Sequence, residues 1–78
     1  MKPGMEDFIL EGSEFIELNK LLKITGLCAS GGMAKAVIAE GRVKVDGKAE
    51  LRKRCKIHAG QVVEFEGHKM HIRNASTT

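Results

Sequence analysis

The sequence predicts an α+β domain in which a helical hairpin packs on a small, mostly antiparallel β-sheet. Apolar residues recur at helical spacing in the first half of the chain, and they alternate with polar residues from residue 43 onward. The length of 78 residues allows a single compact domain with a thin core. A block of helices followed by a block of strands is typical of α+β domains.

The pattern divides the chain into three parts. Residues 1–12 form an N-terminal segment, in which Phe8-Ile9-Leu10 is a candidate edge strand that ends at Gly12. Residues 13–73 form the folded domain, and residues 74–78 form a flexible tail. No run approaches the roughly 18 apolar residues of a membrane helix, and the first residues do not resemble a secretory signal. We therefore expect a cytoplasmic protein with no membrane partner.

Two short helices make up the predicted hairpin. The first is expected to begin at Ser13 or Glu14 and to end at the C-cap residue Gly26. Its apolar face consists of Phe15, Leu18, Leu21 and Leu22. The second is expected to begin at Ser30, whose hydroxyl can accept a bond from a free backbone N–H, and to end at Gly41. Its apolar face consists of Met33, Ala34, Val37 and Ile38.

Alternation of apolar and polar residues marks the strands that follow. Val43 and Val45 face the core, and Asp46-Gly47 predicts a two-residue hairpin turn because both residues tolerate positive φ. Residues 48–51 form the return arm. Turns are expected at Ala59-Gly60 and at Gly67-His68. The last two strands carry their apolar residues at Val63, Phe65, Met70 and Ile72.

Positive charge is concentrated in the middle of the chain. Residues 1–19 carry one Lys against five acids, residues 20–56 carry ten Lys or Arg against three acids, and residues 57–78 carry two of each. The net charges of these parts are therefore −4, +7 and 0. A contiguous basic segment favours a polyanion partner, and the alternative is an ordinary solvated surface.

Residues 15–66 resemble the RNA-binding domain of the S-four type, the alpha-L motif named after a small-subunit ribosomal protein. The chain looks like the stand-alone small bacterial members of that family. The resemblance implies an alpha-L fold that binds structured RNA. It rests on the order and spacing of Leu18, Leu21, Leu22, Gly26, Ser30, Ala34-Lys35, Gly41, Val43-Lys44-Val45-Asp46-Gly47 and Gly60-Gln61.

Two positions depart from the family pattern. The family often carries Arg just before the first leucine of its first helix and just after the capping Ser, where this chain has Glu17 and Gly31. Two phosphate contacts that the resemblance implies are thus missing. Residues 52–56 hold four cations in five positions, and they shift the expected RNA footprint toward the hairpin and this loop.

The expected RNA contacts come from the helices, the hairpin and the basic loop. Ser30 opens a helix whose free N–H groups and dipole favour a phosphate, and the two glycines that follow let it approach. Arg52 and Arg54 are the expected source of any specificity, because Arg can read a base edge or stack on a base. The full set is Lys20, Lys23, Ser30, Lys35, Arg42, Lys44, Lys48, Arg52, Lys53, Arg54 and Lys56.

The sequence offers no support for catalysis, a metal site or a cofactor. His58, His68 and His71 lack Cys or acidic partners at ligand spacing. Cys28 and Cys55 are expected as reduced thiols, because they lack metal spacing and the chain lacks an export signal. We therefore expect no catalytic residue.

The aromatic residues bear on how RNA would be bound. All three fall on apolar stripes and are expected in the core, so no platform for stacking single-stranded bases is expected. Binding should then depend on backbone shape and charge. The three residues are Phe8, Phe15 and Phe65.

Two other functions stay open at this point. The acidic N-terminal segment and its apolar edge are compatible with an adaptor that docks on a ribosomal protein or an acidic protein. The helical hairpin is compatible with DNA binding. The leading expectation is a monomer that binds structured RNA, ribosomal or tRNA-like, or ribosomal particles.

Overall fold

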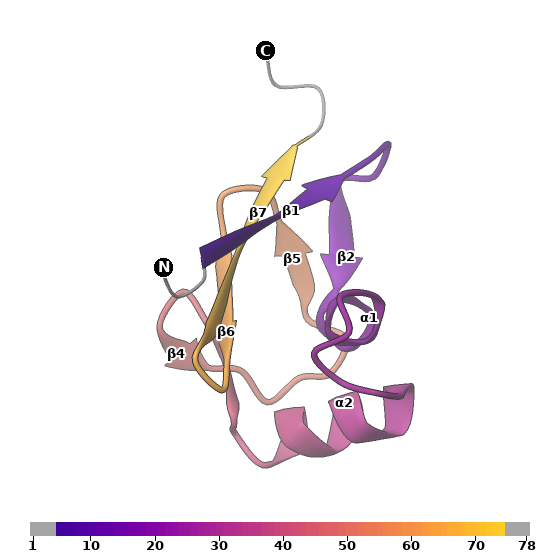
Figure 1. Ribbon diagram of the computed structural model, residues 1–78, viewed down its shortest axis with the longest axis vertical. Helices are drawn as coiled ribbons and strands as arrows, with labels where there is room; N and C mark the ends of the chain where they lie inside the picture. Colours follow the sequence, from indigo (N-terminus) through magenta and orange to yellow (C-terminus); the bar gives the residue numbers. More distant parts are fainter. Residues whose placement is uncertain (1–4, 75–78) are drawn as a thin grey trace.

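The computed structural model describes residues 5–74, which fold as two helices on a mostly antiparallel sheet (Figure 1). This architecture confirms the predicted fold class. No helix among these residues is long and apolar enough to cross a membrane. The elements are β1 Met5–Leu10, β2 Phe15–Glu17, α1 Leu18–Ile24, α2 Gly31–Ala39, β3 Val43–Val45, β4 Lys48–Ala49, β5 Lys56–His58, β6 Val62–Phe65 and β7 His68–Asn74.

The strands form a five-stranded sheet and a separate two-stranded ribbon. The sheet has the order β1-β7-β6-β3-β4, and the ribbon pairs β2 with β5. Strand β1 lies at the sheet edge as expected and runs parallel to β7, while the other pairs are antiparallel. The N-terminal segment is therefore part of the domain sheet. Of the expected tail, only Asn74 lies within the described residues, and it ends β7.

The first helix is shorter than predicted. It begins at Leu18, whereas Phe15–Glu17 forms strand β2, which pairs with β5. The prediction of a helix from Ser13 or Glu14 was wrong, because the pairing partner lies far along the chain and leaves no local signal. Aromatic and β-branched residues favour a pleated strand once such a partner is present. Gly26 follows the helix with a φ of 82°, as a C-terminal glycine should.

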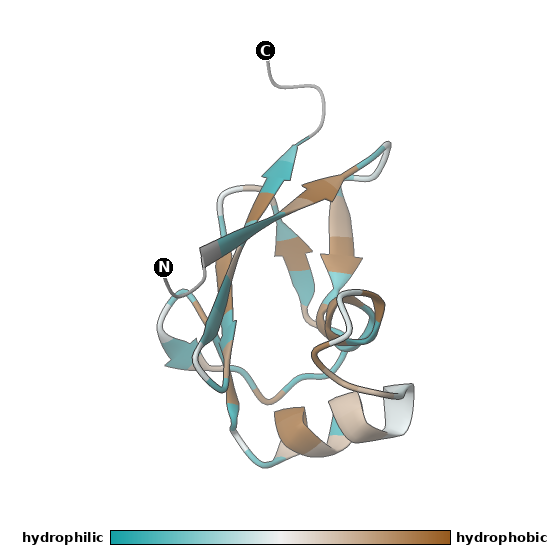
Figure 2. Ribbon diagram, viewed as in Figure 1, coloured by the Kyte–Doolittle hydropathy of each residue, from teal (hydrophilic) through white to brown (hydrophobic). Residues whose placement is uncertain are grey.

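The second helix begins as predicted. The Oγ atom of Ser30 accepts a hydrogen bond of 3.2 Å from the backbone N–H of Met33. Ala34, Val37 and Ile38 are buried, but Met33 is 43% exposed, so its expected place on the apolar face was wrong. At about 100° per residue, Met33 lies on the flank of the stripe that the other three residues form. Figure 2 shows hydrophobic residues gathered at the end of α2 nearer β3.

Two tight turns set the register of the sheet. Asp46 and Gly47 have φ values of 54° and 87°, which confirms the predicted hairpin between β3 and β4. The later turn is formed by Glu66 and Gly67, with φ values of 50° and 84°. The prediction of Gly67-His68 was therefore off by one residue, because His68 already pairs with Phe65.

The core lies between the helices and the sheet, and both helices contribute to it. Phe65 is buried as expected and Phe8 packs partly against the core, whereas Phe15 lies outside the core cluster. The Phe15 prediction failed because its strand directs it to the other face of the ribbon from Ile57. The core residues are Leu10, Leu18, Leu21, Leu22, Cys28, Ala34, Val37, Ile38, Val43, Val45, Ile57, Val63, Phe65, Met70 and Ile72.

Candidate nucleic-acid interface

The backbone of the connection between β4 and β5 is hydrogen-bonded to neighbouring elements at both of its ends. The carbonyl oxygens of Lys53 and Cys55 accept hydrogen bonds from the N–H groups of Asn19 and Leu18, at 3.0 Å and 2.9 Å. These are free amides of the first turn of α1, which has no side-chain cap. At the other end, the N–H of Glu50 donates to the Val43 carbonyl at 3.0 Å. The connection is thus fixed between β3 and α1.

We call residues 52–56 the basic segment. Lys56 is the first residue of β5, so only 52–55 form the loop that the sequence suggested. All four cations of the segment are exposed. Lys53 and Arg54 make no ion pair within residues 5–74, because every pair found there involves other residues. Their charges are therefore available to a partner.

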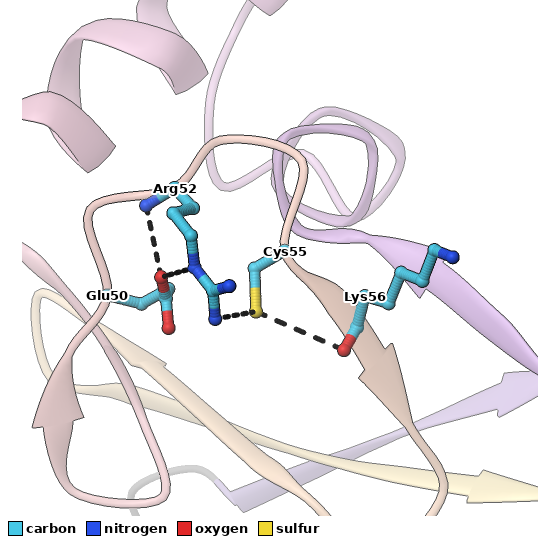
Figure 3. Close-up of polar contacts among 4 residues, drawn as sticks. All are labelled: Glu50, Arg52, Cys55 and Lys56. Atoms are coloured by element: carbon cyan, nitrogen blue, oxygen red, sulfur yellow. Dashed lines mark hydrogen bonds and ion pairs between the residues drawn. The ribbon is translucent and has the colours of Figure 1, made fainter.

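Arg52 is held by Glu50, just before the segment, and lies beside Cys55 within it (Figure 3). Its Nε donates to an oxygen of the Glu50 carboxylate at 2.9 Å, and its backbone N–H donates to the same oxygen at 3.1 Å. The Arg52 hydrogen bonds lower the pKa of Glu50. The Sγ of Cys55 lies 3.9 Å from Nη2 of Arg52, and burial raises the pKa of this thiol. Arg52 is thus oriented but shares its charge with Glu50.

The cations of α1 lie beside the basic segment. Lys20 directly follows Asn19, whose N–H is bonded to the Lys53 carbonyl, so the backbone at Lys20 lies beside that of the segment. Lys23 is three residues further along the helix, a spacing that makes it a surface neighbour of Lys20. Both lysines are exposed. The fold thus brings these α1 residues together with the segment, as a shared RNA contact requires.

The hairpin cations fall into two groups. Lys48 lines an open hollow of about 780 Å³ together with Arg52 and Lys56. Lys44 instead lies on the sheet, opposite Glu64 in register. Arg42 is bound to Glu66 and lies 3.4 Å from a Glu40 oxygen, so its charge is compensated.

The acids at the hollow are already engaged. One oxygen of Asp46 accepts from the Val62 N–H at 3.0 Å, and the other accepts from Nε2 of Gln61 at 3.1 Å. These bonds lower the pKa of Asp46. Glu50 is bound to Arg52. Three cations, Lys48, Arg52 and Lys56, therefore line the hollow against two carboxylates, of which only that of Glu50 is in an ion pair within the described residues.

The start of α2 lies at the opposite end of that helix from Leu51. Leu51, just before the segment, lies near Gly41, past the C-terminal end of α2, because a Cβ at Gly41 would stand 3.7 Å from its side chain. Ser30 lies at the opposite end of this nine-residue helix, which at about 1.5 Å per residue is roughly 13 Å long. Lys35 is exposed one turn into α2. Ser30 and Lys35 form a second group of predicted contacts, on α2.

Two residues near the hollow were missed by sequence reasoning. His58 and Gln61 line it, and Gln61 Oε1 accepts a bond of 2.8 Å from the His58 N–H. The sequence did carry a signal for His58. It alternates with the buried Ile57, and so lies on the same face of the strand as Lys56. Within residues 5–74 no three His, Cys, Asp or Glu side chains gather as a metal site.

Comparison with known proteins places these features in a family. Residues 8–73 match the S4 domain family. A protein of Escherichia coli, YbcJ, named as a candidate RNA-binding protein, is 53% identical over 87% of this chain and 97% of its own length. The solution structure of YbcJ, described as revealing an alpha-L motif involved in RNA binding, superposes with a TM-score of 0.70 and 49% identity, over 94% of this chain and 92% of that one.

Two more distant relatives share the domain. RlbA of Bacillus subtilis, named as a candidate ribosome maturation protein, is 40% identical over 70% of this chain and 78% of its own length. The large-subunit pseudouridine synthase B of Pasteurella multocida is 35% identical over 96% of this chain but only 21% of its own length. The likeness to that enzyme is therefore confined to one domain of it.

Proposed function

The chain belongs to the S4 domain family, and we propose that it is an RNA-binding module that recognises structured RNA. The names of YbcJ and RlbA support a role in RNA binding and in ribosome maturation. The observation that carries the proposal is the basic segment, whose cations are presented from a backbone bonded to the start of α1. Three of its four cations have no ion-pair partner within residues 5–74, and cations crowded in this way repel one another until an anion relieves them.

The proposed interface has a main part and a lesser part. The main part is the basic segment with Lys20, Lys23 and Lys48, because these cations are exposed and have no ion-pair partner within residues 5–74 except for Arg52. A loop that is already fixed loses less conformational freedom when RNA binds. The lesser part is Ser30 and Lys35 at the start of α2. Arg42 and Lys44 lie outside both parts, because Arg42 is ion-paired with Glu66 and Lys44 is not among the residues that line the hollow.

The proposed partner is ribosomal or tRNA-like RNA, alone or within ribosomal particles. We propose that the chain acts in the cytoplasm as a monomer, by binding and without catalysis or a cofactor. The name of RlbA supports the ribosomal partner. The match to a pseudouridine synthase does not support a catalytic role for this chain, because the match covers only 21% of that enzyme's length.

A competition experiment tests RNA against DNA. A fluorescently labelled RNA hairpin is bound to the protein, and unlabelled RNA hairpin or duplex DNA of the same sequence is added while anisotropy is followed. We expect the RNA to displace the label at a concentration at least tenfold lower than the DNA. Equal displacement would contradict RNA recognition and favour general polyanion binding. Stronger displacement by the DNA would support the DNA-binding alternative.

A second candidate function is a protein adaptor that docks through the edge of the sheet. Strand β1 pairs only with β7 among the described strands, and Ile9 on it is 41% exposed. A hollow of about 250 Å³ lies beside it, lined in part by Phe8 and Ile16. Unpaired strand edges can accept a further strand. Capture of a ribosomal protein that survives nuclease treatment would favour this function, and its loss would favour RNA.

A further inference from the structure

An aromatic ring pair lies on the surface of the two-stranded ribbon. Phe15 and His58 are opposite one another in the β2–β5 register, with ring centroids 5.8 Å apart and planes inclined at 52°. The Nζ of Lys56 lies 4.9 Å from the centre of the Phe15 ring. Phe15 is half-buried and His58 is exposed. The sequence had indicated no aromatic platform, because it placed Phe15 in the core.

The ring pair is not needed for packing the interior. The other face of the ribbon supplies the core contacts, through the fully buried Ile57 and the partly buried Ile16. Phe15 and His58 are absent from the core cluster. The Phe15 ring is thus half-buried at the surface beside a cation, and His58 is exposed to a ligand.

His58 also borders the hollow beside the basic segment. His58 lines it with Lys48, Arg52 and Lys56. The backbone at His58 is held by its N–H bond to Gln61 and by the Gln61 N–H bond to its carbonyl, at 2.8 Å and 3.2 Å. An aromatic surface and a group of cations are thus adjacent on a fixed backbone. Aromatic stacking with a cationic groove is how proteins hold unpaired nucleotides.

We propose that this site holds one unpaired nucleotide of the bound RNA. The base stacks on the His58 imidazole, and its phosphate binds the cations of the hollow. Phe15 is a positioning residue, because its ring contacts the imidazole and limits its orientation. The inference rests on the proposed function and adds to it a preference for RNA with a bulged or looped nucleotide over fully paired RNA.

The test compares two RNA hairpins that differ by one bulged 2-aminopurine nucleotide. Anisotropy gives the affinity for each, and 2-aminopurine fluorescence reports stacking of the bulged base. We expect His58→Ala to weaken binding of the bulged hairpin about five- to tenfold, and to change binding of the paired hairpin less than about twofold. His58→Phe should retain the bulge preference and the fluorescence quenching, because it keeps the ring without the imidazole nitrogens.

The control is His68→Ala, which removes an exposed histidine at the start of β7. It should leave both affinities unchanged, and thermal melting should show that all variants fold. Phe15→Leu should reduce the bulge preference less than His58→Ala does. No change in His58→Ala, or an equal loss on both hairpins, would overturn this inference alone. Failure of the wild-type chain to bind either hairpin would overturn the proposed function together with it.

Discussion

The basic segment and the start of α2 differ in how they present charge. The segment places four cations on a backbone that is bonded to α1 through the carbonyls of Lys53 and Cys55. The start of α2 offers free amides and two glycines, with one cation, Lys35, a turn away. A Cβ at Gly31 would meet nothing within 4 Å, so packing does not require glycine there. Charge density therefore favours the segment as the main contact to RNA phosphates. Open space around the backbone favours the close approach of a phosphate at the start of α2.

The Glu at position 17, where the family often has Arg, fits an RNA footprint that is shifted toward the basic segment. Glu17 is directly opposite Lys56 in the β2–β5 register. An Arg at position 17, as the family often has, would face Lys56 with a like charge across the strands, which is destabilising. The cation thus lies on β5 in this chain and the acid on β2.

The largest effect is expected from removing the arginines of the segment. The double change Arg52→Ala with Arg54→Ala should weaken binding of an RNA hairpin about tenfold, equivalent to about 1.4 kcal/mol. Most of this loss should come from Arg54, because Arg52 shares its charge with Glu50. Anisotropy on the single and double variants measures it. A greater loss of RNA affinity for Lys35→Ala than for the double variant would mean that the start of α2, and not the basic segment, makes the main contacts.

The next effect concerns folding at the start of α2. Ser30→Ala removes the cap bond to the Met33 N–H and should lower the free energy of unfolding by about 1 kcal/mol. Denaturant unfolding followed by circular dichroism measures this. RNA affinity of the folded variant should change by less than about twofold, because the hydroxyl is already used in the cap. A large loss of affinity without a loss of stability would make Ser30 a direct contact.

Smaller changes should follow at Gly31 and Lys35. These residues are four apart on α2 and therefore share a face. Lys35→Ala should weaken RNA binding about threefold, and Gly31→Arg should strengthen it about threefold by adding the cation that the family often has. Isothermal titration of each variant with the same hairpin measures both. If Gly31→Arg has no effect, RNA does not reach this end of α2.

The smallest effect is a pH dependence of stability. The hydrogen bonds from Arg52 hold the pKa of Glu50 below its usual range in the folded state. This contribution to stability is present above the unfolded pKa and is lost as the pH falls through the folded pKa. Wild type should therefore be more stable than Glu50→Gln at pH 7, and the difference in melting temperature should shrink and vanish in acid, as the pH falls through the folded pKa of Glu50. A difference that persists there would exclude this ion pair as its cause.

Local signals predicted most of the fold. The cap at Ser30, the turn at Asp46-Gly47 and the glycines after both helices depend on neighbours in sequence, and all are present. Strand β2 was missed because its partner, β5, is distant in sequence. A helix over residues 15–17 would fit the apolar spacing equally well, and only the pairing of these residues with β5 excludes it.

The candidate site was less predictable than the fold. The cationic residues could be named from the sequence, but their ion pairs could not. Glu66, which binds Arg42, is 24 residues away from it, and the contact depends on the β3–β6 register. The ring pair of Phe15 and His58 has the same origin, because it exists only when β2 pairs with β5. The geometry of such sites depends on pairing between strands that are distant in sequence. The spacing of apolar residues along the chain does not reveal that pairing.

The central claim is that the basic segment makes the main contacts to RNA phosphates. Its direct test is the slope of log Kd against log salt concentration for an RNA hairpin, measured for wild type and for the Arg52→Ala, Arg54→Ala double variant. Wild type should release about four to six counterions, and the slope should fall by about one for each phosphate contact removed. A wild-type affinity independent of salt, or a double variant with an unchanged slope, would contradict the claim.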